Sequence, residues 1–182
     1  MLTHLRPAVT LTILFTLLLG LFYPLAITGV AQAVFPSQAN GSQVTRDGAL
    51  VGSALIGQAF ESERYFHGRP SAVNYDASTS SGSNLGPSSK VLLAAIAERA
   101  AAYPGVQIPA DLVTASGSGL DPDLSPAGAL AQVPRIAAAR GLTECAVRQL
   151  VAAQTRGFDL AILGDPRVNV LALNLALDEL KP

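Results

Sequence analysis

The longest apolar run of the chain lies near its N-terminus. Residues 8–27, AVTLTILFTLLLGLFYPLAI, contain no charged side chain. About 20 residues is the length that a helix needs to cross the hydrocarbon core of a bilayer, so the pattern predicts one transmembrane helix, assigned to residues 8–30. A cleaved signal peptide is the alternative, because Ala31-Gln32-Ala33 has a small-x-small pattern. Against it, the apolar part of a signal is usually only about 7 to 15 residues.

Charges near the ends of this run predict its orientation. The amino terminus and Arg6 precede the run, and no Lys or Arg follows until Arg46. Basic residues are retained on the cytoplasmic side of membrane helices. We therefore expect residues 1–7 in the cytoplasm and the remainder of the chain, beyond the helix, outside it.

Inside the predicted helix, small or polar residues recur at every fourth position: Thr12, Thr16, Gly20, Pro24 and Thr28. Such a strip lies on one face of a helix and permits close approach of a neighbouring helix. The alternative is that the threonines bond to their own helix carbonyls and face lipid. Pro24 cannot donate to the carbonyl of Gly20, so an irregularity is expected between these two residues.

After the apolar run, residues 31–48 are polar and rich in turn formers, which indicates a linker, and 49–182 form the expected folded body. The fold class predicted is α+β: a single transmembrane helix followed by one mixed helix and strand domain outside the cytoplasm. Turn and cap signals place its elements. We expect strands at 49–56 and 112–114, an irregular stretch at 57–90, and helices at 90–103, 125–139, 143–156 and 168–180.

Three of the body helices have recognisable start signals. Ser88 and Ser89 can cap the helix from 90, Ser125-Pro126 begins the next, and Thr143 begins the third. The last helix is apolar nearly all round, which predicts burial in the core. A strand is the alternative for this last segment, because its leucines alternate from 171 to 177.

Composition limits the possible partners. The 12 Lys and Arg nearly balance the 13 Asp and Glu, so no strong positive field exists to hold nucleic acid. The single cysteine, Cys145, cannot form an internal disulfide, and we expect it to be a small buried apolar residue.

Catalytic motifs are absent from the sequence. It holds no Gly-Lys-Ser/Thr phosphate loop and no Gly-x-Ser-x-Gly elbow, and only His4 and His67 could serve as histidine ligands to zinc. We therefore expect no metal, no cofactor of its own and no catalytic site. A membrane-anchored or secreted envelope hydrolase that uses His67 is the alternative class.

The irregular stretch contains an aromatic and cationic cluster, Tyr65, His67 and Arg69, with Asn84 further along. Such residues are typical of protein interfaces, so this loop is a candidate partner surface. Equally, its side chains could bond to the backbone of the loop itself.

A series of distinctive sequence blocks runs along the chain: Leu5-Arg6-Pro7-Ala8, Tyr23-Pro24-Leu25, Gln38-Ala39-Asn40-Gly41-Ser42, Gly52-Ser53-Ala54-Leu55-Ile56-Gly57-Gln58, Tyr65-Phe66-His67-Gly68-Arg69-Pro70-Ser71-Ala72, Gly82-Ser83-Asn84-Leu85, Val113-Thr114-Ala115-Ser116, Ser118-Gly119-Leu120-Asp121, Val168-Asn169 and Leu173-Asn174-Leu175-Ala176-Leu177-Asp178. In these blocks, and over essentially its whole length, the chain resembles the C-subunit family of the Kdp potassium-transporting P-type ATPases. So many blocks in one order leave little room for coincidence.

The resemblance implies a bacterial plasma-membrane complex with two larger partners. A channel-like subunit carries potassium, and a P-type subunit hydrolyses ATP through an aspartyl phosphate. The small subunit is described as a catalytic chaperone that raises the ATP affinity of the hydrolysing subunit. The Asp-Lys-Thr-Gly phosphorylation sequence is absent here, which agrees with an accessory role.

The chaperone description conflicts with the predicted orientation, because a body outside the membrane cannot touch cytoplasmic ATP. Any effect on nucleotide affinity would then be a coupling free energy between distant sites. If ATP contact were direct, Gln132 and Arg135 would be the candidates, since they offer an amide and a guanidinium together. Otherwise Gln132 is an ordinary glutamine on a helix surface.

Overall fold

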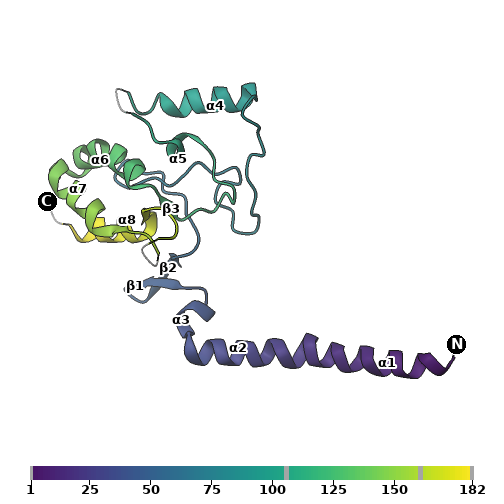
Figure 1. The fold of residues 1–182 in the computed structure, drawn as a ribbon. Coiled ribbons are helices and arrows are strands. Elements are labelled where there is room, and N and C mark those ends of the chain that lie inside the picture. Colours follow the sequence, from purple (N-terminus) through teal and green to yellow (C-terminus); the bar gives the residue numbers. More distant parts are fainter. Residues whose placement is uncertain (1, 105–106, 160–161, 181–182) are drawn as a thin grey trace. The chain divides into compact units, whose positions relative to one another are not determined.

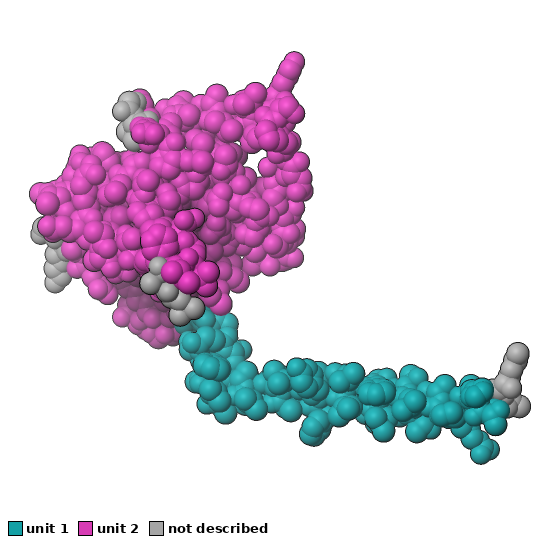
Figure 2. Space-filling view, viewed as in Figure 1, with its two compact units in different colours: residues 1–43 teal, residues 44–182 magenta. Residues whose placement is uncertain are grey.

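The computed structural model describes residues 2–104, 107–159 and 162–180. The chain divides into two compact units, Met1–Gln43 and Val44–Pro182, which are coloured separately in Figure 2. The first unit is mostly helix, and the second combines helices with short strands (Figure 1). This confirms the predicted combination of an apolar N-terminal helix and a mixed helix and strand domain.

The first unit contains one long helical stretch. It consists of α1 (Leu2–Leu17), the π-helical turn η1 (Leu18–Phe22) and α2 (Tyr23–Val34). The 32 residues Thr3–Val34 are long and apolar enough to cross a membrane, and none of the span's most apolar window is buried within the chain. Large apolar side chains point outward all along it, which suits a lipid environment.

The expected irregularity between Gly20 and Pro24 is confirmed, and it takes the form of the π-helical turn η1. Tyr23 donates its N–H to the carbonyl of Leu18, five residues back. Pro24 has no N–H, so the next helical hydrogen bond cannot form. The helix accommodates this loss by widening for one turn just before the proline.

The segment predicted as a linker contains regular structure. Residues 31–34 still belong to α2, a short helix α3 spans Pro36–Ala39, and strand β1 spans Gln43–Arg46. Strand β2 (Ala49–Ser53) pairs with β1 in a two-stranded sheet. Asp47 and Gly48 join them with φ angles of 52° and 79°, the left-handed pair required by a tight hairpin turn.

Residues 54–89 are all described and form neither helix nor strand, as the predicted irregular stretch requires. Backbone hydrogen bonds attach this stretch to the segment before β3: Gly57 donates to Leu120 at 2.8 Å, and Ser116 donates to Pro70 at 3.0 Å. The long loop is therefore an ordered part of the body.

Among its described residues, the second unit also contains five helices. Their bounds are α4 (Lys90–Ala100), α5 (Ala110–Val113), α6 (Pro126–Arg140), α7 (Glu144–Gln154) and α8 (Val170–Glu179). Ser89, Ser125 and Thr143 each accept a backbone N–H at the start of a helix, which confirms the predicted caps.

One predicted element of the body is of the wrong type. The strand expected at 112–114 is wrong, because residues 110–113 form the helical turn α5, in which Leu112 and Val113 are buried. Three residues without a partner strand carry too little pattern to separate the two states. Helix α6 continues through Pro134 to Arg140, and Gly141, with a φ of 68°, is its left-handed C-cap.

A small antiparallel sheet closes the body. Its strands are β3 (Asp123–Leu124), β4 (Thr155–Arg156) and β5 (Arg167–Asn169), with β5 in the middle. Strand β5 leads directly into α8, and Asn169 caps that helix by accepting the N–H of Ala172 at 3.0 Å. The last segment is thus a buried strand followed by a buried helix.

The core lies between α6, α7, α8 and β5. Leu173, Leu177, Val133, Ile136 and Val147 are each fully buried there. The predicted burial of the last helix is confirmed. Figure 1 shows α4 apart from these helices, and it has no fully buried residue.

Candidate functional site

The cluster predicted from the irregular loop is built on two buried side-chain amides. Phe66 donates its N–H to Asn174 at 2.8 Å, and Asn174 returns a bond to the Phe66 carbonyl at 3.0 Å. His67 and Gln132 pair in the same way, at 2.9 and 3.0 Å. Asn174 comes from α8 and Gln132 from α6, so two different helices pair successive peptide groups of the loop.

Burial makes these pairs structurally important. Phe66 and Gln132 are 0% exposed, and Asn174 is 2% exposed. Leaving a buried peptide group without a partner destabilises the fold by more than one hydrogen bond stabilises it. The two side-chain amides therefore supply the hydrogen bonds that a neighbouring strand would otherwise give to this loop. The interpretation of Gln132 as a residue on a helix surface is therefore wrong. Its position in the core depends on a loop about 65 residues away in the chain.

Two arginines hold the same loop through its carbonyl groups. Arg135 donates to the carbonyls of Glu63 and Tyr65 at 2.6 and 3.0 Å and to the side chain of Gln132 at 2.8 Å. Arg140 donates to the carbonyl of Arg64 at 2.7 Å. A guanidinium has five donors in a fixed plane, which allows one side chain to hold several acceptors.

Tyr65 and Asp178 extend this network. The Tyr65 hydroxyl lies 3.3 Å from the Asp178 carboxylate, which also pairs with Arg140 and Arg46 at 2.8 Å each. The Arg140 guanidinium lies 4.7 Å from the centre of the Tyr65 ring. Burial opposes the charge of Asp178, but the hydrogen bonds from these three side chains outweigh it and lower its pKa.

His67 is half-buried, and its pKa is lowered first by burial and then by the positive charge of Arg135. Its Nε2 lies 3.1 Å from the carbonyl oxygen of Ser62. The imidazole is therefore neutral near pH 7 and is placed against a backbone carbonyl rather than against a hydroxyl nucleophile.

A cavity of about 390 Å³ opens beside this cluster. His67 and Arg135 line it together with Glu63, Tyr103 and Pro134. Burial raises the pKa of Tyr103, which stays a neutral phenol. Four of the eight lining residues carry polar or charged groups, so the wall of the cavity combines these groups with apolar surface.

Arg69 belongs to a separate part of the loop. It pairs with Asp121 at 2.9 Å, and its carbonyl accepts the Tyr75 hydroxyl. Burial, with the charge of Asp121, raises the pKa of Tyr75 to about 12. Asn84 is exposed and has a φ of 53°. The structure thus brings Tyr65 and His67 into one network, whereas Arg69 is held by its own ion pair.

The predicted strip on the first unit borders a groove of about 630 Å³. The residues that line the groove are Leu11, Thr12, Phe15, Thr16, Leu19 and Gly20. An added Cβ at Gly20 would meet no atom within 4 Å, so the face above Gly20 is open. Pro24 lies one turn beyond, next to η1.

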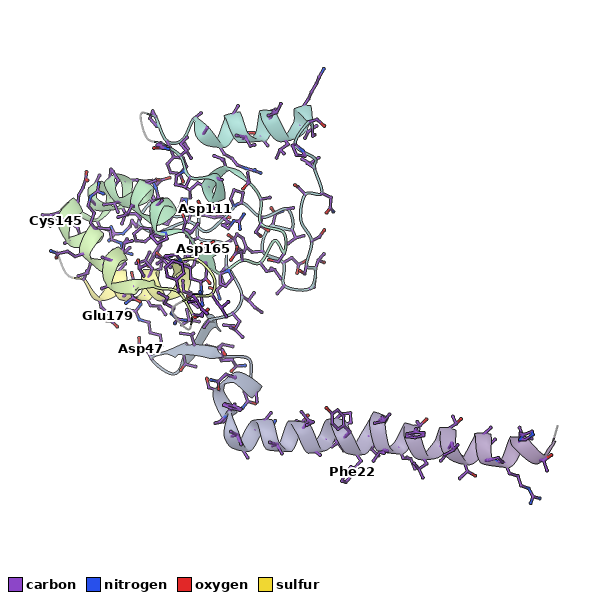
Figure 3. The ribbon with its side chains drawn as sticks, viewed as in Figure 1. Phe22, Asp47, Asp111, Cys145, Asp165 and Glu179 are labelled. Carbon is purple, nitrogen blue, oxygen red and sulfur yellow. The ribbon has the colours of Figure 1, made fainter. Side chains whose placement is uncertain are left out.

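Several important residues lacked a local signal in the sequence. Asn174 and Asp178 lie on a helix whose apolar residues dominate the pattern, and Arg140 reads as a basic residue at a helix end. Cys145 is exposed rather than buried, so that expectation is wrong (Figure 3). Helix α7 turns Val147 and Val151 inward, and Cys145 lies off that face.

The structure combines a long apolar helix, able by length and composition to cross a membrane, with a mixed helix and strand body that contains an ordered loop. No metal-ligating cluster occurs among the described residues. The model of the family "K+-transporting ATPase, c chain" (KdpC) matches residues 5–179. The chain belongs to this KdpC family of potassium-transporting ATPase subunits.

Curated relatives agree over the full length. The potassium-transporting ATPase KdpC subunit of Caulobacter vibrioides (strain NA1000 / CB15N) is 60% identical, covering 100% of this chain and 96% of the relative. Those of Methylobacterium nodulans and Rhodopseudomonas palustris (strain BisB5) are 56% and 54% identical. They cover 99% and 98% of this chain and 98% of each relative.

Proposed function

We propose that this chain is a non-catalytic accessory subunit of an ATP-driven, high-affinity potassium uptake complex in a bacterial plasma membrane. Membership of the KdpC family carries the proposal, since the relatives are named as subunits of a potassium-transporting ATPase. The partners are a potassium-channel-like subunit and a P-type subunit that hydrolyses ATP. The chain itself holds no cofactor, and its work is assembly and coupling.

In this proposal the helix crosses the membrane once, the N-terminus is cytoplasmic, and the body lies outside over the mouth of the transporter. Arg6 before the helix and the lack of Lys or Arg until Arg46 support this orientation. The exposed Cys145 offers a direct test. A membrane-impermeant maleimide should label the chain in cells with a permeable outer envelope and an intact plasma membrane, and should fail to label Cys145→Ser. Labelling only after the plasma membrane is broken would show that the body lies in the cytoplasm, which is the opposite orientation.

The accessory role extends to nucleotide affinity. We expect the bound subunit to raise the ATP affinity of the hydrolysing subunit through the membrane helices, as a coupling free energy between distant sites. Direct contact through Gln132 and Arg135 has less support, because both side chains are engaged by the loop. The test is the KM for ATP of the partner subunits alone and after addition of the purified chain. An unchanged KM would refute the chaperone role.

Two surfaces are assigned to the partners. The strip of Thr12, Thr16, Gly20 and Pro24 packs against a partner helix, and its open groove supports this assignment. A partner outside the membrane contacts the loop residues Tyr65, His67, Arg69 and Asn84. The hydrogen bonds that α6 and α8 make to the loop backbone support this assignment, because they fix the loop in one conformation. A hydrolase that uses His67 is less favoured, since its Nε2 faces a backbone carbonyl.

A further inference from the structure

The π-helical turn η1 changes which carbonyl groups of the membrane helix have donors. The N–H of Tyr23 donates to the carbonyl of Leu18, five residues back. In a regular α-helix the same N–H would donate to the carbonyl of Leu19, four residues back. The Leu19 carbonyl has therefore lost its α-helical donor.

Pro24 removes the donor that would come next. Its nitrogen carries no hydrogen, so it can serve neither Leu19, five residues back, nor Gly20, four residues back. Leu25 is the next residue with an N–H, and it lies within helical reach of Gly20 and Leu21 only. The backbone of the helix therefore provides no regular donor for the Leu19 carbonyl.

A bilayer cannot supply the missing donor. The turn lies within the apolar stretch Thr3–Val34, and lipid chains have no hydrogen-bond donors. Backbone polar groups in the hydrocarbon region have to be satisfied within protein, so an unpaired carbonyl there is strongly unfavourable. A neighbouring helix is one of the sources that satisfy such a freed carbonyl within a membrane.

The carbonyl belongs to a residue that lines an open surface. Leu19 and Gly20 line the groove of about 630 Å³ together with Thr12 and Thr16. Phe22, in the same turn, projects from the helix and is 69% exposed (Figure 3). π-helical turns within α-helices occur frequently at functional sites.

We propose that the Leu19 carbonyl accepts an interhelical hydrogen bond from a hydroxyl or amide side chain of a partner's transmembrane helix that lies in this groove. The inference rests on the proposed function, in which the strip packs against a partner helix. It adds the chemistry of that partner: Ser, Thr, Asn or Gln at the point of closest approach. A purely apolar helix would leave the carbonyl unpaired.

Carbonyl NMR tests the bond directly. The sequence holds three Leu–Gly pairs, so ¹³C-carbonyl leucine combined with ¹⁵N-glycine selects only the carbonyls of Leu19, Leu85 and Leu163. The Leu19 signal is the one that disappears in Gly20→Ala. We expect it further downfield in the complete complex than in the chain alone in lipid nanodiscs, because hydrogen bonding deshields a carbonyl carbon. The same shift in both states would overturn the inference.

A proline variant tests the consequence for assembly. Pro24→Ala restores an N–H that can serve the helix carbonyls, so the partner's donor loses its acceptor. The affinity of the chain for a complex purified through a partner's tag should fall roughly three- to thirtyfold, the effect of one interhelical hydrogen bond. Pro7→Ala, the same exchange within α1, is the matched control and should bind as the parent does.

Gly20→Leu separates this inference from the proposed function. Suppose that Gly20→Leu is lost from the complex, that Pro24→Ala binds as the parent does, and that the parent's Leu19 carbonyl shift is the same in the free chain and in the complex. These results would support helix packing at the strip and would overturn the proposed hydrogen bond. Full retention of both variants would refute helix docking at this strip as well.

Discussion

The membrane helix and the body treat polar and apolar groups in opposite ways. Along α1 and α2 the large apolar side chains are exposed, with Leu25 at 63% and Phe22 at 69%. In the body the apolar residues are buried, and so are the polar side chains of Gln132, Asn169 and Asn174. The surroundings explain the contrast, since lipid accepts apolar surface, whereas water drives it inward.

Both regions nevertheless face the same difficulty, a stretch of backbone without regular hydrogen-bond partners. At Phe66 and His67 the partners are side-chain amides from the chain's own helices. At Leu19 the chain offers no such side chain, and in our proposal another subunit provides it. Irregular backbone in the body is stabilised by side chains of the same chain, whereas our proposal assigns the corresponding role in the helix to another subunit.

The largest effect is expected when one of the buried side-chain amides that pair with the loop backbone is removed. Asn174→Leu keeps a similar volume but leaves the N–H and the carbonyl of Phe66 without partners. Each buried unpaired group costs about 1–3 kcal/mol, so the loss of both partners should lower the free energy of unfolding by about 2–6 kcal/mol. Denaturant unfolding of the full chain in detergent measures this. Gln149→Leu, at an exposed glutamine of α7, should stay within about 0.5 kcal/mol. Equal losses would show that the amide pairing carries no special weight.

The next effect concerns the helix. Gly20→Leu fills the groove and should weaken binding to the complex by about 1–2 kcal/mol, which is roughly five- to thirtyfold in the dissociation constant. Gly29→Leu adds the same volume at a second open position outside the groove and should bind normally. Retention on a tagged partner subunit provides the measurement, together with potassium uptake. If the two variants behave alike, the groove faces lipid.

A smaller effect follows from the titration of His67. Its folded-state pKa lies below the ordinary value of 6.5, so the unfolded chain binds more protons as the pH falls through this range. The stability contributed by the neutral imidazole is present above pH 6.5 and is lost on acidification below it. Unfolding at about pH 8 and about pH 5.5 should show a greater loss for the parent than for His67→Gln. The same loss in both would assign the pH dependence to other groups.

The smallest effect is expected for an ion pair on the surface of the body. Arg46→Gln removes one of three donors to Asp178, and the Arg46 side chain is 42% exposed. Such pairs contribute about 0–1 kcal/mol, so the free energy of unfolding should change by less than about 1 kcal/mol. Calorimetry of the full chain measures it. A loss well above this would show that β1 depends on this single contact.

The sequence by itself determined the features that depend on neighbours along the chain. The apolar run specified the long helix, and Pro24 specified the position of its irregular turn. The starts of three helices were specified by Ser89, Ser125 and Thr143. Each of these rests on a bond or a length within a few residues, which local physics fixes. The order of the sequence blocks was likewise enough to indicate the family.

Only the tertiary structure decided which polar side chains are buried and what they hold. Gln132 lies 65 positions from His67 and Asn174 lies 108 from Phe66, so no local pattern could pair them. The same holds for the turn at Leu112, whose burial depends on packing, and for Cys145, whose exposure depends on which face of α7 meets the core. A side-chain amide is equally compatible with water and with a buried peptide group. Its role is set by which distant backbone the fold brings to it.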